Sequence, residues 1–145
     1  VLKFLRSTPI VSIAAVAGDE PISSLVLFAY DEDLTAYFAT GQSSYKTQAL
    51  LKNPRLSFST WFLDQMFVQG RGRVEPLSDA KDIEATLDKL AEATKAVPDF
   101  WPPLLQIWKQ DYIAFKVKIE WLRVMDLSQS KLKSAESPFQ DIKLT

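Results

Sequence analysis

Short apolar runs that alternate with polar residues dominate the chain and indicate β-strands. Turn-forming residues separate these runs, as at residues 18–21, where Gly, Asp, Glu and Pro follow one another. The predicted strands are residues 9–16, 25–30, 34–40, 55–61, 65–75 and 112–122. The last run alternates throughout, and its predicted inward face is Ile113, Phe115, Val117, Ile119 and Trp121.

Two segments show helical patterns instead. Residues 45–52 lack alternation, follow two serines that can cap a helix, and stop at an Asn-Pro pair. Residues 78–95 repeat apolar positions every three or four residues, and Ser78 is the predicted N-cap. Residues 98–108, aromatic and interrupted by proline, predict a turn followed by a short helix.

The order of these elements predicts an antiparallel barrel. Most connections have hairpin length, whereas a doubly wound sheet needs a helix after nearly every strand. We therefore expect a mainly β protein, a six-stranded antiparallel barrel with flanking helices, over residues 1–126. Gly70 and Gly72 inside one strand indicate a bulge or sharp coiling. Residues 127–145 are predicted to form a weakly structured tail or an arm over a partner subunit.

Composition narrows the chemistry. The 145 residues include no cysteine and no histidine, which excludes disulfides, thiolate or histidine metal sites, and Ser-His or Cys-His triads. The net charge of −1 argues against nucleic-acid or membrane partners. The apolar start is rich in β-branched residues and continues into a predicted strand, so we interpret it as part of the fold rather than a signal peptide and expect a cytoplasmic protein.

The segment that begins at Thr40 carries the most informative chemistry. Lys46 lies in the first turn of a predicted helix, where the helix dipole disfavours a cation and favours an anion. A bound phosphate would explain Lys46 together with the hydroxyls of Ser44 and Thr40. Alternatively, Ser43 or Ser44 is only an N-cap and Lys46 points into solvent.

Two stretches of sequence carry a family resemblance. FATGQSSYKTQALLKNPRLSFSTW contains a strand that ends in Thr, then Ser-x-Lys, a helix and Asn-Pro, and QMFVQGRGRVEPLSD follows it. Together with IEW near residue 120, their order resembles the pyridoxamine 5′-phosphate oxidase-like family of flavin-binding split barrels, in particular its general-stress branch. The resemblance covers most of residues 1–125.

The resemblance implies an FMN site and a homodimer. By position, Lys46 and Ser44 would bind the FMN phosphate, with Thr40 near the same ligand. Gln65 would hydrogen-bond the flavin ring, and Trp121 would line the cofactor from the neighbouring subunit, or else be an inward-facing core tryptophan. No catalytic residue is implied.

The chain also departs from the oxidases. Tyr45 and Ser24 stand where the oxidases have phosphate-binding arginines, so these two cofactor positions have lost positive charge and we expect weaker binding. Residues 28–30 read Phe-Ala-Tyr where the oxidases have a substrate-binding lysine, and their arginine-rich closing motif is absent. Vitamin B6 oxidation is therefore not expected.

Three function hypotheses follow from the resemblance. The first is an FMN-dependent oxidoreductase that uses a reduced nicotinamide and an unidentified acceptor. The second is a non-catalytic flavin-binding stress protein, and the third is a deazaflavin-dependent reductase.

Other clusters receive structural interpretations. Arg71 and Arg73 share a predicted strand face that could meet an anion, although a solvated or interfacial face is the simpler interpretation. The acidic residues 31–33 are interpreted as a turn rather than a metal site. Trp101 and Trp108 are expected to pack a helix over the barrel mouth or to contact a ligand.

Overall fold

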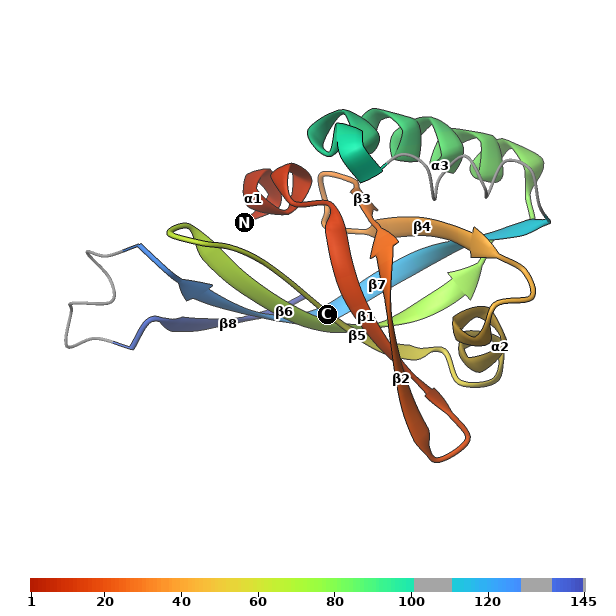
Figure 1. Ribbon diagram of the computed structural model, residues 1–145, viewed down its shortest axis with the longest axis horizontal. Coiled ribbons are helices and arrows are strands. Elements are labelled where there is room, and N and C mark those ends of the chain that lie inside the picture. The colour runs from red at the N-terminus through yellow and green to blue at the C-terminus, as the bar shows by residue number, and fades with distance from the viewer. Residues whose placement is uncertain (101–110, 129–136, 145) are drawn as a thin grey trace.

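The computed structural model describes residues 1–100, 111–128 and 137–144 of the chain. Strands outnumber helices and follow one another in groups between the helices, as expected for a mainly β protein (Figure 1). The strands are β1 (Ile10–Ala17), β2 (Glu20–Leu27), β3 (Ala29–Tyr30), β4 (Ala36–Gly41), β5 (Arg55–Phe62), β6 (Met66–Pro76), β7 (Tyr112–Asp126) and β8 (Phe139–Lys143). The helices are α1 (Leu2–Ser7), α2 (Tyr45–Lys52) and α3 (Ala80–Ala93), followed by the 3-10 turns η1 (Thr94–Ala96) and η2 (Pro98–Phe100).

The strands form one curled antiparallel sheet in the order β2-β1-β5-β6-β7-β4-β3, with β8 paired to β7. The two ends of this order, β2 and β3, are consecutive in the chain and only Phe28 separates them. The amide of Phe28 donates a hydrogen bond to the carbonyl of Pro9 at 2.8 Å. The sheet thus curls into a half-barrel whose two edge strands are joined end to end at Phe28, which confirms the predicted barrel class.

Aromatic rings fill the inside of the curl. Phe28 stacks on Phe38 at a centroid distance of 5.6 Å, and Phe38 stacks on Phe115 at 5.2 Å. All three side chains are fully buried, so apolar burial from strands distant in sequence holds the barrel together. Outside the core, α2 packs against β1, and α3 covers β3 and β4 (Figure 1).

The two glycines of β6 fit the predicted irregularity. A Cβ atom at Gly70 would lie 2.4 Å from the ring of Phe58, and one at Gly72 would lie 2.3 Å from the carbonyl oxygen of Lys118. The pairing of β6 with β7 shifts register between Arg71 and Gly72. The register skips Glu120, which makes this a β-bulge in β7 and confirms the prediction of a bulge in this region.

The bulge overturns the predicted inward face of Trp121. Strict alternation would place Trp121 with Ile119, but Glu120 is an extra residue and shifts every later side chain of β7 by one position. Leu122 therefore enters the core, and Trp121 lies on the outer face opposite Arg71. The interpretation of Trp121 as a core tryptophan is wrong for this reason.

The structure also adds elements that the sequence pattern did not predict. The helix α1 precedes β1. The strand β2 already begins at Glu20, because the two-residue turn at residues 18 and 19 pairs Glu20 directly with Ala17 of β1. Residues 139–143, which were assigned to the C-terminal tail, form β8. The N-cap of α3 is Asp79 instead of Ser78, since the Asp79 carboxylate accepts hydrogen bonds from the first-turn amides. Of the segment expected to follow as a turn and a short helix, η2 is described, whereas Trp101 and Trp108 lie outside the described residues.

Candidate functional site

The turn between β4 and α2 has a closed hydrogen-bond network. The hydroxyl of Ser44 accepts a hydrogen bond from the amide of Thr47 at 3.3 Å, so Ser44 is the N-cap of α2. The Thr47 hydroxyl donates to the carbonyl of Gly41 at 2.8 Å, and the two hydroxyls of Ser44 and Thr47 are 2.8 Å apart. Because Thr47 has a single hydroxyl proton, Ser44 must donate its own proton to Thr47. Ser44 therefore orders the start of the helix in this structure.

The backbone at the start of α2 keeps donors free. The amides of Tyr45 and Lys46 are the first two of the helix, and among the described residues neither donates to a backbone carbonyl that precedes the helix. Together with the helix dipole, they create a positive potential at this point. An anion at the start of α2 would receive hydrogen bonds from the main chain itself.

Lys46 adds a side-chain charge to this potential. Its side chain is half-buried, and burial lowers the pKa of its ammonium group. No ion pair joins Lys46 to any residue that the structure describes. A cation that is partly removed from water without a countercharge is unfavourable, and a bound anion would remove this cost. Anion binding at Lys46 stays a prediction, as does the alternative in which its ammonium group points into solvent while its stem packs against the protein.

The other predicted residues near this turn have different environments. Thr40 is buried, with an exposed fraction of 3%, next to the end of β4. Ser24 lies on β2 opposite Ile13, on the inward side of a strand that α2 contacts, and is partly exposed. Tyr45 is 89% exposed. One strand-turn-helix unit thus brings Thr40, Ser44, Tyr45 and Lys46 together, with Ser24 on a strand next to α2.

Gln65 and Trp121 are not part of this cluster within one chain. Gln65 lies in the turn between β5 and β6, and this turn is at the opposite end of the molecule from α2 (Figure 1). The eight residues of β5 alone span about 27 Å between these two places. Trp121 lies on the outer face of β7, where the guanidinium of Arg71 is 4.7 Å from its ring centroid. A single subunit cannot bring Gln65 to the start of α2.

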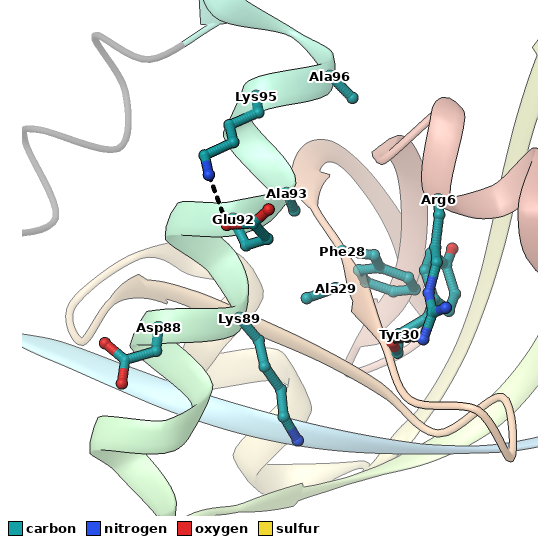
Figure 2. Close-up of a pocket in the computed structure, with 10 residues that line it drawn as sticks. All are labelled: Arg6, Phe28, Ala29, Tyr30, Asp88, Lys89, Glu92, Ala93, Lys95 and Ala96. Atoms are coloured by element: carbon teal, nitrogen blue, oxygen red, sulfur yellow. Dashed lines mark hydrogen bonds and ion pairs between the residues drawn. The ribbon is translucent and has the colours of Figure 1, made fainter.

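A pocket of about 740 Å³ lies between α3, α1 and β3 (Figure 2). Its floor is formed by residues 28–30. Every basic side chain around it has an acidic partner among the described residues. The pairs are Arg6 with Glu32 at 3.0 Å, Lys89 with Asp31 at 2.8 Å, and Lys95 with Glu92 at 2.8 Å.

Tyr30 gives the floor of this pocket an unusual polar group. Its hydroxyl is buried and has no hydrogen-bond partner among the described residues, and burial raises the pKa of its phenol. The ring packs edge-on against Phe28 at a centroid distance of 5.8 Å. The pocket is therefore largely apolar at its base, with paired charges at its rim. Sequence reasoning did not identify it, because its walls come from three separate segments and share no local motif.

Two further features concern ions and membranes. Within the described part of the chain, no three side chains of the types that commonly bind metals come together. None of the described helices is long and apolar enough to cross a membrane.

Comparisons with known proteins agree with the geometry. A general stress protein 26 from Bacillus anthracis superposes with a TM-score of 0.66 at 17% identity, over 97% of this chain and 93% of the other. A FAD-binding protein from Mesorhizobium loti gives 0.66 at 21% identity, over 84% and 88% of the two chains. A haem-binding protein from Mycobacterium smegmatis gives 0.70 at 13% identity, over 99% of this chain and 56% of the other. At these identities the likeness shows the fold alone.

The sequence comparison extends the result from fold to family. A search of curated protein sequences finds no significant match. The sequence profile of the pyridoxamine 5′-phosphate oxidase family matches residues 1–126, which is most of the chain. The chain belongs to the pyridoxamine 5′-phosphate oxidase-like family of split-barrel proteins.

Proposed function

We propose that the chain binds FMN with its phosphate at the start of α2 and acts as a flavin-dependent oxidoreductase. The observation that carries this proposal is Lys46, a half-buried lysine without an ion pair among the described residues, next to two free amides. A phosphate is the small anion that best matches this donor set, because it accepts several hydrogen bonds and carries up to two charges. Family membership and the FAD-binding neighbour support a flavin as the carrier of that phosphate.

The residues around the site would bind and orient the cofactor. Lys46 and the amides of Tyr45 and Lys46 would hold the phosphate, while Ser44 keeps the helix start in place. When bound, a flavin supplies hydride and electron transfer, so the chain itself needs no nucleophile. Because the chain has no histidine, any proton transfer would use a lysine, a tyrosine, a carboxyl group or water.

We further propose that the site is completed by a second copy of the chain. Gln65 lies too far from Lys46 in one subunit, so its predicted contact with the flavin ring requires the partner, and Trp121 lies on the outer face of β7, where a partner's flavin could reach it. The tip of the β5–β6 hairpin supports this arrangement, since Trp61, Phe62 and Leu63 expose 61%, 55% and 67% of their surface. Exposed neighbouring apolar side chains of this size are typical of a protein interface.

The pocket between α3 and β3 is the place we assign to the substrate. Its basic residues are already paired, and Ala29 offers no charge, so a phosphorylated vitamin B6 compound would find no free cation there. An uncharged substrate with a ring or short apolar chain fits this lining better. The substrate class therefore differs from that of the oxidases that name the family.

The cofactor proposal is tested by spectroscopy and titration. Purified protein should show flavin absorption bands, or it should bind added FMN saturably. Lys46→Ala should weaken FMN binding by about 1.5–3 kcal/mol, because a charged hydrogen bond to phosphate is lost. Lys52→Ala, in the last turn of the same helix, removes the same charge from an exposed position and should leave affinity within about twofold. Equal losses in both variants would remove Lys46 from the site.

Mixed dimers test the shared site. Lys46→Ala and Gln65→Ala chains each place a defect in both sites of their own homodimer. A heterodimer of the two has one site with both defects and one site with intact Lys46 and Gln65. Mixing should therefore restore tight FMN binding at about one site per dimer. No restoration would contradict a site built from both subunits.

An activity screen separates the remaining hypotheses. An oxidoreductase should oxidise NADH or NADPH faster than free FMN does, with at least one acceptor. Turnover no faster than free FMN would favour a non-catalytic flavin-binding protein. Tighter binding of a deazaflavin than of FMN would favour the third hypothesis, since both cofactors present a phosphate.

A further inference from the structure

The outer face of the sheet carries a second concentration of positive charge, away from the start of α2. A groove of about 420 Å³ crosses β5, β6, β7 and β8. It contains four basic side chains and one acidic side chain, in a protein with a net charge of −1. The lining residues are Arg55, Leu56, Arg71, Arg73, Glu120, Trp121 and Lys143. We call it the arginine groove.

The strand register brings like charges into direct opposition near this groove. Arg73 is paired with Arg55 on β5 and with Lys118 on β7, so three cations stand in one row across three strands. Side chains in such directly opposite positions have Cβ atoms only about 4.5–5.5 Å apart, and like charges there destabilise a sheet. Neutral residues at these outer-face positions would avoid the repulsion. A bound anion would turn this cost into a favourable interaction.

The bulge in β7 shapes the groove. Because Glu120 is the extra residue, Glu120 and Trp121 follow each other on the same outer side instead of alternating. The ring of Trp121 then holds the guanidinium of Arg71 at 4.7 Å and that of Arg123 at 5.8 Å by cation–π contacts. Arg71 is thus positioned without an acidic partner, which leaves its N–H groups for a ligand.

The charges in the groove are only partly compensated. Arg73 contacts Glu120 at 3.3 Å, but within the described residues Arg55, Arg71 and Lys143 form no ion pair. The lining has an excess of three positive charges, which would balance the negative charge of a diphosphate near neutral pH. Arginine is also the side chain best suited to bidentate binding of phosphate oxygens.

We propose that the arginine groove binds a small ligand through a diphosphate group. The groove has the volume of a small-molecule site, and the negative net charge of the chain disfavours a long nucleic acid. Lys46 is not part of it. Lys46 begins α2, whereas Arg55 follows the end of that helix, and the eight residues of α2 span about 12 Å. The groove shares Trp121 with the proposed flavin site, but the diphosphate contacts proposed here use Arg55, Arg71 and Lys143, none of which is assigned to the flavin.

Calorimetric titration with inorganic pyrophosphate tests the groove. The measurement uses the full chain saturated with FMN and, in parallel, the chain without added FMN. We expect one pyrophosphate per chain in both, with affinity lowered about tenfold or more by Arg71→Gln and by Arg55→Gln. Arg6→Gln is the matched control, because Arg6 is ion-paired to Glu32 outside the groove, and it should change affinity at most about twofold. Lys46→Ala should retain pyrophosphate binding without FMN.

Four outcomes would overturn the proposal. The first is an absence of saturable pyrophosphate binding in the wild type. The second is binding that Lys46→Ala abolishes and Arg71→Gln does not. The third is loss of FMN or of the dimer in Arg71→Gln with a normal circular dichroism spectrum, which would make the groove part of the flavin site or an interface. The fourth is an oligonucleotide that competes at more than tenfold tighter affinity. If Arg71→Gln does not fold, Arg55→Gln at the exposed start of β5 decides alone.

Discussion

Two regions of this molecule differ in whether their basic side chains have acidic partners among the described residues. Around the pocket between α3 and β3, each lysine and arginine is matched with a carboxylate, as in the 2.8 Å pair of Lys89 with Asp31. At the start of α2, Lys46 is half-buried and forms no ion pair with any described residue. Paired surface charges stabilise a fold slightly, whereas an unpaired and partly buried charge destabilises it. This difference is the basis for the proposed anion site at the start of α2.

The largest expected effect is the loss of FMN affinity at high pH, which tests whether the unpaired charge of Lys46 contributes to binding. Burial lowers the pKa of Lys46 from its ordinary value of 10.5, so its charge is lost at a lower pH than that of an exposed lysine. Only the charged form attracts phosphate, and affinity should fall about tenfold or more as the pH rises from 8 through this pKa. Fluorescence titration of FMN between pH 8 and 11 measures it.

Two variants isolate the contribution of Lys46 to this pH profile. Lys46→Ala should bind FMN weakly and should not lose further affinity through titration of Lys46. Its pH profile therefore measures any contribution from titration of the FMN itself. Lys46→Arg keeps its charge over the whole range and should flatten the profile while retaining most of the affinity. A wild-type profile parallel to that of Lys46→Ala would show that the lysine charge does not contact the phosphate.

Local signals in the sequence were sufficient for the helix that forms the site. The predicted bounds 45–52 agree with the structure, and Ser44 is the cap among the two serines, Ser43 and Ser44, that the sequence offered, because a capping serine and an Asn-Pro stop act within a few residues. The cap of α3 shows the limit of such signals. Ser78 and Asp79 are both good capping residues, and the local sequence does not distinguish them. The barrel class was also predictable, since alternation and hairpin-length connections repeat along the whole chain.

Features that depend on pairing between distant strands were not predictable. The bulge at Glu120 depends on the register between β6 and β7, so an alternation rule placed Trp121 on the wrong face. The strand β8 is mostly polar and forms by pairing with β7, which a pattern search for apolar alternation does not detect. The arrangement of Gln65 and Lys46 in one flavin site stays a prediction, because it depends on a second chain.

A moderate effect is expected at the cap of α2. Ser44→Ala removes the hydrogen bond from the Thr47 amide and should lower the free energy of unfolding by about 1 kcal/mol. Because the Ser44 proton is already donated to Thr47, the direct loss of phosphate binding should be smaller than for Lys46→Ala. Urea unfolding and FMN titration on the same variant measure the two quantities. A loss of affinity as large as that of Lys46→Ala, at unchanged stability, would mean that Ser44 reorients to bind the phosphate.

The smallest effect is expected at the paired lysine of the pocket. Lys89 contacts Asp31 and also lies 4.3 Å from the ring centroid of Tyr37, but the side chains of its ion pair are about one third exposed, which weakens the attraction by solvent screening. Lys89→Gln should lower the free energy of unfolding by about 0.5–1 kcal/mol and leave FMN affinity within about twofold. Urea unfolding and FMN titration again provide the two values. A tenfold loss of FMN affinity in Lys89→Gln would contradict the comparison, because a lysine with an acidic partner would then be part of the ligand site. The presence of an acidic partner would no longer distinguish the two regions.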